Sequence, residues 1–494
     1  MSAVGEIHFG TDGWRGVIAE DFTFANVGRV ARAIADYLKS PDRKKASIYT
    51  EWGSEYRPAT SGVVIGYDTR FLSEAFAAQV GTVLMDEEIP AYLSAEPIPT
   101  PALSYAVEDR RAAAGVMITA SHNPPQYNGL KIKAEFASSV PPEVTAAIER
   151  RIPRRFSAPQ HRPDQLKRVD LKTPYLKRLG ELIDRERIRS APLHVVIDAM
   201  YGSARGCIAD VLDEIGVSYV EIRTANNPYF GRGHPEPLAR NLVPLKAVIA
   251  SERRRQQTGE ILIGLATDGD GDRVAGMDEN GVLIDSHRCY ALIFKHLVEA
   301  RGWTGKAVKS FALTDMANRI AAQHRVTVHE VPIGFKYVSE LFLKDDILIG
   351  GEESGGIGIK DHIPDRDGAL MALLLLEITA VHRCPMSEII DKMMQGIGYH
   401  YYERRDLHLD HVEDRDRVVA RLTQRPPDQF ADRRLRTIED LDGIKLRFDD
   451  GWLLFRPSGT EPVLRLYTEM NAPDKLGEVL DAAERYARGD LRLW

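Results

Sequence analysis

Residues 260–272, EILIGLATDGDGD, contain the pattern that determines the class of fold. The first half is a short run of apolar and β-branched residues, which is typical of a buried strand. The second half is a polar turn of alternating aspartates and glycines. Two other runs have the same form, GVVIGYDTR at residues 62–70 and LHVVIDAMYG at residues 193–202. Each of the three runs predicts a strand that ends in a polar loop.

Helical patterns lie between these strands. Residues 25–38, ANVGRVARAIADYL, place four apolar side chains on one face at helical spacing: Val27, Val30, Ile34 and Leu38. The most apolar run, ALMALLLLEITAV at residues 369–381, is too short to cross a bilayer and contains a glutamate, so it predicts a buried helix. Strands that alternate with helices predict α/β layers, with ligand loops at the carboxyl ends of the strands.

The length predicts several domains, because 494 residues exceed what one hydrophobic core usually holds. A basic, proline-rich run at residues 150–168 predicts a linker after the first domain. The sequence VAGMDENGVLID predicts a hairpin that turns at Asn280–Gly281 and closes the second domain. We place the domains at residues 1–160, 161–285, 286–400 and 401–494, the last a small sheet with a terminal helix.

The composition is that of a soluble globular protein, with 44% hydrophobic and 28% charged residues. A net charge of −7 gives no basis for a nucleic-acid-binding surface. The three cysteines are far apart and form no CxxC motif, which argues against a zinc site and suits a reducing compartment. The first residues, MSAVGEIHFG, lack the features of a signal peptide. We therefore expect a cytoplasmic protein that binds neither nucleic acid nor a membrane.

The loop TDGDGDR at residues 267–273 is a candidate metal site. Asp268, Asp270 and Asp272 alternate with glycines that allow three carboxylates to converge, and such oxygen ligands favour Mg²⁺, Mn²⁺ or Ca²⁺. A solvated acidic turn is the alternative interpretation. An EF-hand is excluded because its sixth position would be Arg273 instead of glycine. An arginine beside the carboxylates also suits phosphate chemistry.

Two further loops offer groups for a phosphorylated sugar. RPSGTEP at residues 456–462 follows a predicted strand and supplies one guanidinium, two hydroxyls and a glycine, which together suit a phosphate: Arg456, Ser458, Gly459 and Thr460. GGEESGGIG at residues 350–358 sets Glu352 and Ser354 among glycines, where they could contact sugar hydroxyls. Each loop alone could also be an ordinary turn.

Other motifs narrow the choice of chemistry. The loop FGTDGWRG at residues 9–16 carries Arg15, and TASHNPPQYNGLKIK at residues 119–133 places Ser121 beside a histidine in a proline-containing loop. The sequence has no GxSxG, no GxxxxGK[ST] and no GxGxxG after a strand. These absences argue against an α/β-hydrolase, a P-loop nucleotide-binding protein and a nicotinamide-dependent enzyme.

Taken in order, these motifs resemble the α-D-phosphohexomutase family over essentially the whole chain. FGTDGWRG and TASHNPPQYNGLKIK lie in the first predicted domain, DGDGDR in the second, GGEESGG in the third and RPSGTEP in the fourth. The resemblance implies a heart-shaped protein in which three α/β domains and a smaller, mobile α+β domain surround a central cleft.

The resemblance also implies roles for the residues. Ser121 would carry a phosphoryl group whose oxygens complete a Mg²⁺ site begun by the three aspartates. Lys131 would be the general acid or base with His122 as its partner, and Arg15 and Arg273 would lie beside the transferring group. Glu352, Ser354 and Lys336 would bind the sugar, and the loop of Arg456 would hold the phosphate of the substrate.

The implied reaction interconverts hexose 1-phosphate and hexose 6-phosphate through a hexose 1,6-bisphosphate, which would also serve as activator. Many phosphomannomutase/phosphoglucomutases have a histidine where Gly356 stands, and this difference favours glucose, with mannose as the alternative. Glucosamine and pentose phosphates are further alternative substrates. The alternative functions are a hexose-bisphosphate synthase, a phosphatase and a non-catalytic sugar-phosphate-binding protein. Sugar phosphates are the expected ligands, and the chain could be a monomer or a homodimer.

Overall fold

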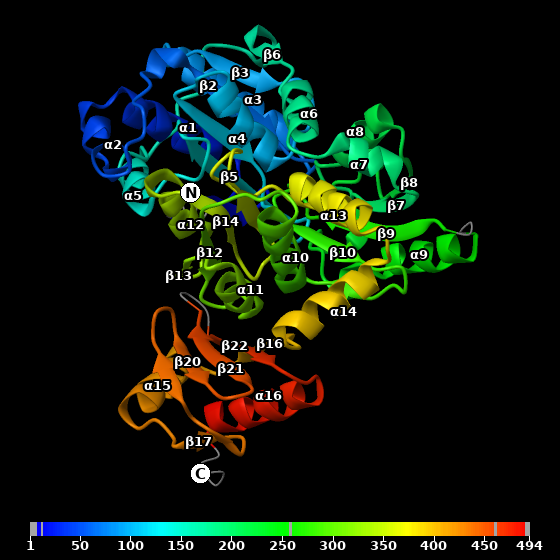
Figure 1. Ribbon diagram of the computed structural model, residues 1–494. Helices are drawn as coiled ribbons and strands as arrows, with labels where there is room; N and C mark the ends of the chain where they lie inside the picture. The colour runs from blue at the N-terminus through cyan, green and yellow to red at the C-terminus, as the bar shows by residue number, and fades with distance from the viewer. Residues whose placement is uncertain (1–6, 11–12, 256–258, 459–461, 490–494) are drawn as a thin grey trace. The chain divides into compact units, whose positions relative to one another are not determined.

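The computed structural model describes residues 7–10, 13–255, 259–458 and 462–489, which form two compact units. The first unit comprises residues 1–306 and 334–389, and the second comprises residues 307–333 and 390–494. Both units combine sheets with covering helices (Figure 1). The α/β class predicted from the sequence is confirmed.

The first unit begins with a six-stranded sheet in the order β1-β5-β4-β2-β3-β6. Strands β2, β3, β4 and β6 are parallel, whereas β5 pairs antiparallel with both β4 and β1. The strands are β1 (Trp14–Val17), β2 (Val63–Tyr67), β3 (Ala91–Ser94), β4 (Ala114–Ile118), β5 (Tyr127–Ala134) and β6 (Lys167–Val169). The main helices are α1 (Phe24–Lys39), α3 (Ser73–Asp86), α4 (Thr100–Asp109) and α5 (Pro142–Glu149). The predicted helix and its apolar face are confirmed, because all four predicted side chains of α1 are buried.

The chain reverses its direction of winding between β2 and β4. Helix α3 leads from β2 to β3 on one side, and α4 then leads to β4 on the other side of β2. The loops that follow β2 and β4 therefore diverge from a common point at the carboxyl edge of the sheet. Ligand sites in open α/β sheets form at such switch points. Asp68 follows β2 here, and Thr119 and Ser121 follow β4.

The last two residues of the segment predicted as a linker, residues 150–168, belong to the first sheet. Residues 167–169 form its edge strand β6, which pairs in parallel with β3. The backbone N–H groups of Gln160 and His161 donate to the carboxylate of Asp86 at the end of α3. The first sheet thus continues past residue 160.

The second sheet has five strands in the order β11-β10-β9-β7-β8. They are β7 (Leu193–Asp198), β8 (Ser218–Ile222), β9 (Ile261–Thr267), β10 (Val274–Met277) and β11 (Leu283–Ile284), accompanied by α6 (Lys172–Glu181), α7 (Arg185–Ser190), α8 (Cys207–Ile215) and α9 (Val243–Arg255). The predicted hairpin is confirmed, because β10 and β11 are antiparallel and Gly281 has a φ of +75° in the turn. Strand β9 ends directly before the aspartate loop.

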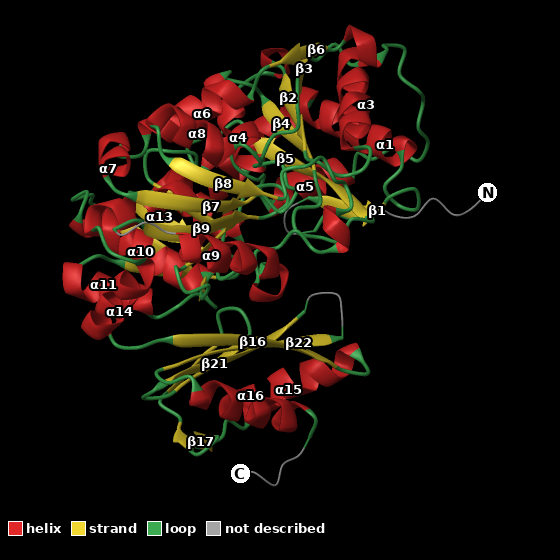
Figure 2. Ribbon diagram, turned by 90° about the vertical axis from the view of Figure 1, so that its right-hand side faces the viewer, coloured by secondary structure: helices red, strands yellow, loops and turns green. Residues whose placement is uncertain are grey.

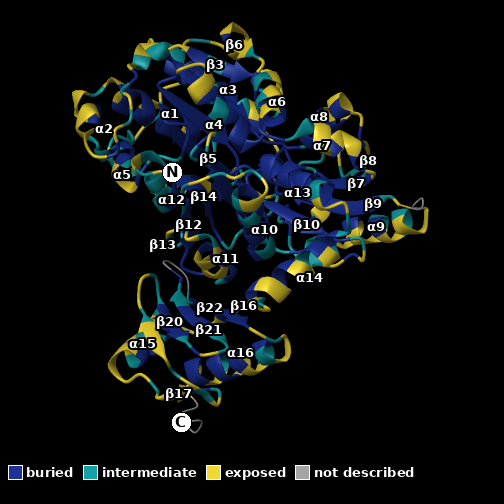
Figure 3. Ribbon diagram, in the orientation of Figure 1, coloured by how far each residue is buried: buried dark blue, intermediate teal, exposed yellow. Residues whose placement is uncertain are grey.

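The remainder of the first unit surrounds a buried helix. Its elements are α10 (Ser286–Glu299), α12 (Phe335–Lys344), β14 (Ile347–Gly351), β15 (Ile357–Ile359) and α13 (Gly368–His382). Helix α13 contacts β9, β10 and α10, and it is buried along almost its whole length (Figure 3). The predicted buried helix is confirmed. Within the described ranges, no single helix has the length and apolar character needed to span a membrane; only α13 together with α14 (Met386–Ile397) does, across a bend of 83°.

The second unit contains a five-stranded antiparallel sheet in the order β16-β22-β21-β20-β19. Its strands are β16 (Tyr401–His408), β19 (Thr437–Glu439), β20 (Ile444–Arg447), β21 (Gly451–Pro457) and β22 (Val463–Met470). Helices α15 (Val412–Gln424) and α16 (Asp474–Ala487) cover the same face of this sheet (Figure 2). The unit also holds β12 (Lys306–Ser310) from its second residue onward, α11 (Met316–His324) and β13 (Val328–Val331). Strands β12 and β13 are parallel. The predicted α+β character of the C-terminal region is confirmed.

Candidate active site

Ser121 lies in the loop between β4 and β5, in a backbone conformation that its neighbours must hold. Its φ is +51°, in the left-handed region that non-glycine residues seldom adopt, and its side chain is buried. The backbone N–H of Ser121 donates to Oγ1 of Thr119 at 2.9 Å. The hydroxyl oxygen lies 3.0 Å from Oδ2 of Asp268, although the two residues are far apart in the sequence. The predicted serine and the predicted metal loop therefore meet.

Arg70 holds the serine loop in place, and it belongs to none of the functional motifs recognised in the sequence. Its guanidinium donates to four backbone carbonyls of the loop, at 2.6 Å to Ser121, 2.6 Å to Asn123, 2.8 Å to Pro124 and 3.0 Å to Tyr127. Asp68 orients the guanidinium at 3.2 Å and also accepts from the hydroxyl of Thr119 at 2.6 Å. The only sequence signal was the position of YDTR after a buried strand at the switch point.

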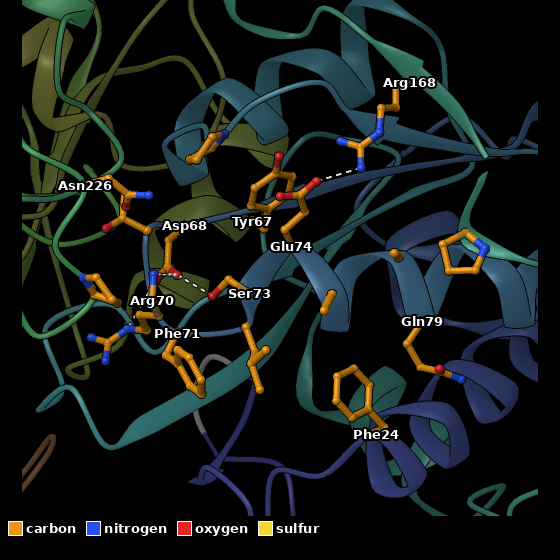
Figure 4. A pocket seen from close by; sticks show the side chains of 17 residues that line it. Phe24, Tyr67, Asp68, Arg70, Phe71, Ser73, Glu74, Gln79, Arg168 and Asn226 are labelled. Atoms are coloured by element: carbon orange, nitrogen blue, oxygen red, sulfur yellow. Dashed lines mark hydrogen bonds and ion pairs between the residues drawn. The ribbon is translucent and has the colours of Figure 1, made fainter. Parts of the chain in front are cut away.

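A cavity of about 600 Å³ lies beside Asp68 and Arg70 (Figure 4). Phe24, Phe71 and Tyr67 supply aromatic surface, and Arg168 donates to Glu74 at 2.6 Å on its wall. Asp68 and Arg70 form part of its lining, so the cavity adjoins the serine loop. No predicted site residue within the described part of the chain lines it.

The three aspartates of the loop after β9 are buried and converge. One carboxylate oxygen from each of Asp268, Asp270 and Asp272 lies within 4.8 Å of the others. Oδ1 of Asp270 and Oδ1 of Asp272 are buried and have no hydrogen-bond partner among the described residues. Buried carboxylate oxygens without donors are unfavourable unless a cation satisfies them. The site therefore fits a hard divalent cation, which Asp268, Asp270, Asp272 and an oxygen on Ser121 would hold.

Glycine allows the aspartate loop and the serine loop to approach one another. A Cβ atom on Gly269 would lie 2.5 Å from the carbonyl oxygen of Ser121, and Gly271 has a φ of +73°. Any larger residue at position 269 would separate the two loops. The alternation of aspartate and glycine is thus required by the contact with the serine loop as well as by convergence of the carboxylates.

Lys131 lies on β5 and points into the aspartate cluster. Its ammonium donates to Oδ2 of Asp270 at 2.9 Å and to Oδ2 of Asp272 at 3.2 Å. Thr100 adds a hydrogen bond of 2.6 Å to Asp270. Burial would raise the pKa of Asp270, but Lys131 and Thr100 hold that pKa well below its usual range. Burial and the two neighbouring carboxylates raise the pKa of Asp268 well above its usual range.

Three further predicted residues lie around the serine. Nδ1 of His122 is 3.4 Å from the hydroxyl oxygen of Ser121. Burial, together with Arg273 and Arg15, lowers the pKa of His122 well below its usual value, so the imidazole is neutral at pH 7. Arg15 donates to the side chain of Asn123 at 2.8 Å, and Arg273 donates to Glu236 at 3.1 Å. Positive charge from two arginines therefore acts on the imidazole beside Ser121.

The predicted sugar loop joins β14 to β15. Glu352 is buried there and accepts a hydrogen bond of 3.1 Å from Arg366, which also forms an ion pair of 2.9 Å with Asp272. Burial raises the pKa of Glu352 to about 7, although the guanidinium of Arg366 acts in the opposite direction. Ser354 is partly exposed in the same loop. Lys336 lies on α12 with its ammonium 4.9 Å from the ring centre of Tyr337, a contact that does not join it to the other loops.

The predicted phosphate loop belongs to the second unit. Arg456 lies on β21 with its guanidinium 3.1 Å from Asp442, and the carbonyl of the buried Ser458 accepts a hydrogen bond from Arg415. Gly459 and Thr460 lie outside the described residues.

Models of the phosphoglucomutase/phosphomannomutase domains match the chain in sequence order. The α/β/α domain I model matches residues 6–158, domain II residues 173–281, domain III residues 285–397, and the C-terminal domain residues 412–485. The chain therefore has four domains of this family, and it belongs to the phosphoglucomutase/phosphomannomutase family, the α-D-phosphohexomutases. It is an enzyme of the phosphomutase type.

The relatives of this chain differ in the sugar phosphate that their names specify. A phosphoglucomutase/phosphomannomutase of Thermococcus kodakarensis is 30% identical over 96% of both chains. A phosphoglucosamine mutase of Carboxydothermus hydrogenoformans is 29% identical over 96% of this chain and 97% of its own length. A crystal structure from Thermus thermophilus, assigned as a phosphomannomutase, has a TM-score of 0.84 and 33% identity, covering 98% of this chain and 100% of that one.

Proposed function

We propose that this enzyme interconverts hexose 1-phosphate and hexose 6-phosphate through a phosphoserine at position 121 and a hexose 1,6-bisphosphate. The observation that carries the proposal is the convergence of the Ser121 hydroxyl, His122 and the aspartate loop, with 3.0 Å between Ser121 Oγ and Asp268 Oδ2. A serine in this position can carry a phosphoryl group between two arrays of charge, carboxylates for a cation on one side and arginines on the other. A sugar bisphosphate would also keep Ser121 phosphorylated between turnovers.

Each residue then has a defined task. The sugar hydroxyl attacks phosphorus, the bond from phosphorus to Ser121 Oγ breaks, and the proton of the hydroxyl passes to the neutral imidazole of His122. The ammonium of Lys131 donates a proton to the departing seryl oxygen, which His122 also contacts, so one proton is accepted and one is donated in each transfer. Arg70 holds the loop, which keeps the seryl oxygen aligned. A bound Mg²⁺ would supply positive charge to the phosphoryl oxygens.

Glucose phosphate is the sugar phosphate that we propose as substrate. The carboxylate of Glu352 is paired with the guanidinium of Arg366, and this pairing offsets its negative charge. Such a pair supports hydrogen bonds to neutral hydroxyls more than an ion pair with a sugar ammonium. Glucosamine phosphate is the second candidate, because the relative from Carboxydothermus hydrogenoformans is named for it. Mannose phosphate is the third, given the names of two other relatives.

We propose that Arg456 binds the phosphate that is not being transferred. Arg456→Ala is then expected to raise KM about tenfold or more with a smaller change in kcat, since binding of that group is lost in the ground state as well. An unchanged KM would exclude this role.

The test is a turnover assay with Mg²⁺ and a trace of glucose 1,6-bisphosphate, with Ser121→Ala as the blank. Glucose, mannose and glucosamine 1-phosphates are supplied separately. Turnover of glucose 1-phosphate that Ser121→Ala abolishes supports the proposal, and faster turnover of another sugar would revise the substrate alone. Release of inorganic phosphate would indicate a phosphatase, and accumulation of bisphosphate from a separate donor a synthase. No activity with any of these substrates would reject the proposed reaction.

A further inference from the structure

Arg366 connects the sugar loop and the metal loop of the candidate site. It lies between β15 and α13 and is buried. Its Nη1 is 3.1 Å from Oε2 of Glu352 in the sugar loop, and its Nη2 is 2.9 Å from Oδ2 of Asp272 in the metal loop. One planar group thus contacts a carboxylate from each loop, a geometry that suits the fixed donors of a guanidinium.

The neighbours of Arg366 fix its backbone independently of these two contacts. Asp365 accepts from Lys133 on β5 at 2.6 Å and from Ser104 on α4 at 2.9 Å. Asp367 accepts from the hydroxyl of Tyr175 at 2.9 Å and from the backbone N–H of Leu370 at the start of α13. The surrounding elements therefore fix the backbone position of Arg366. Its side chain can then determine the orientation of Glu352, because its own position does not depend on that glutamate.

The glycine at position 356 makes room for this arginine. A Cβ atom on Gly356 would lie 2.0 Å from Cδ of Arg366 and 2.7 Å from its Cγ. No side chain at position 356 can share this space with Arg366 in its present position. The guanidinium also lies 5.5 Å from the ring centre of Phe335, which limits its movement on another side. Gly356 and Arg366 therefore form one structural unit.

We propose that Arg366 is a positioning residue that sets Glu352 for the hydroxyls of the sugar and couples the sugar loop to the metal loop. This inference rests on the proposed function. Arg366 acts through Glu352 in sugar binding and discrimination, and formation of the phosphoserine does not depend on it. Gly356 is required because only a residue without a side chain leaves the arginine in place.

A double-mutant cycle between Arg366 and Glu352 tests this coupling. Arg366→Met is expected to lower kcat/KM for the preferred hexose 1-phosphate about 30-fold, mainly through KM, while in the Glu352→Gln background the same change costs about threefold or less. The ratio of kcat/KM for glucose and mannose phosphates is expected to move toward one in both single variants. Arg255→Met, at an exposed arginine, is the matched control. Additive effects would overturn the inference.

Gly356→Ala supplies a second test that leaves both carboxylates and the arginine in the chain. It is expected to raise KM as Arg366→Met does, and to have little effect once Arg366 is replaced by Ala, because the methyl group then has space. An equal effect of Gly356→Ala in both backgrounds would contradict the shared-space argument.

Two measurements separate this inference from a general structural role and from the proposed function. Intact mass after incubation with glucose 1,6-bisphosphate is expected to show the same phosphoserine content in Arg366→Met and in the unsubstituted enzyme. Binding of glucose 1-phosphate in the Ser121→Ala background, measured by calorimetry, is expected to weaken with Arg366→Met even if turnover is too slow to follow. A changed Mg²⁺ requirement with unchanged sugar binding would overturn the inference. An unsubstituted enzyme without mutase activity would reject the proposed function itself.

Discussion

The guanidinium of Arg70 donates a hydrogen bond of 2.6 Å to the carbonyl oxygen of Ser121, and the same group holds three more carbonyls of the loop. Ser121 has a positive φ, and a residue in this conformation persists only where its surroundings over-determine it. Arg70 supplies that constraint from the end of the neighbouring strand. The alignment of the seryl oxygen therefore depends on a side chain that has no direct part in the chemistry.

Replacing Arg70 by lysine tests this alignment. A lysine keeps the charge but cannot reach four carbonyls from one planar group, so kcat is expected to fall about 10- to 100-fold. Steady-state kinetics and the phosphoserine content by intact mass are the measurements. Arg110→Lys, at an exposed arginine over the ring of Tyr92, is the control. Wild-type kcat in Arg70→Lys would show that other contacts are sufficient to fix the loop.

Replacing Asp270 by asparagine tests the metal site. The change removes one of the three carboxylates and leaves Lys131 with a weaker partner. Turnover is expected to fall about 100-fold or more, and the rise in thermal midpoint that Mg²⁺ produces in the unsubstituted protein is expected to disappear. Asp109→Asn, at an exposed aspartate, should leave both properties unchanged. A normal Mg²⁺ response in Asp270→Asn would mean that the cation binds elsewhere.

Replacing Lys131 by methionine tests how the negative charge of the three aspartates is neutralised when no metal ion is bound. The ammonium forms ion pairs of 2.9 Å with Asp270 and 3.2 Å with Asp272, and its loss leaves buried carboxylates with less compensating charge. We expect a loss of about 3 kcal/mol of stability in metal-free buffer, and a larger stabilisation by Mg²⁺ than in the unsubstituted protein. Urea denaturation with and without Mg²⁺ measures both effects, with the exposed Lys167→Met as control. An Mg²⁺ effect no larger than that of the unsubstituted protein would contradict the neutralising role.

The sequence predicted the parts of the molecule that depend on local pattern. Strands β2, β7 and β9 were recognisable because each is a short apolar run that leads into a polar turn. Helix α1 was recognisable because the spacing of its apolar residues is helical. The aspartate cluster was recognisable because its three ligands lie within five residues. Its contact with Ser121 followed only from the family resemblance, since no local pattern links loops so far apart in the chain.

The residues that could not be predicted from the sequence act through contacts with distant parts of the chain. Arg70 and Arg366 are single arginines in segments without a distinctive motif, and their roles depend on carbonyls and carboxylates supplied by other elements. The proline-rich segment at residues 150–168 was predicted as a linker because composition indicates a break in regular structure but not what the segment packs against. The roles of Arg70 and Arg366 and the position of β6 all depend on contacts between residues that are far apart in the sequence.

The buried carboxylate of Glu377 gives a prediction about stability at low pH. Glu377 lies on α13 and accepts from Nε2 of His296 at 2.8 Å, from Nε of Arg301 at 2.8 Å and from the backbone N–H of Asp184 at 2.7 Å. Burial acts to raise its pKa, but these donors together lower the pKa from 4.5 to about 2. The charged form is thus favoured in the folded state more than in the unfolded one.

The sign of the effect follows from this lowered pKa. A carboxyl group with a folded-state pKa below its unfolded value contributes stability above pH 4.5 and loses it as the pH falls toward 2. Glu377→Gln is expected to reduce the free energy of unfolding by about 3 kcal/mol at pH 7, because one pKa unit corresponds to about 1.4 kcal/mol. The difference from the unsubstituted protein should shrink between pH 4.5 and 2, as measured by urea denaturation at each pH. Glu51→Gln, at an exposed glutamate, should show no such dependence, and a pH-independent difference for Glu377→Gln would mean that its packing, not its charge, stabilises the fold.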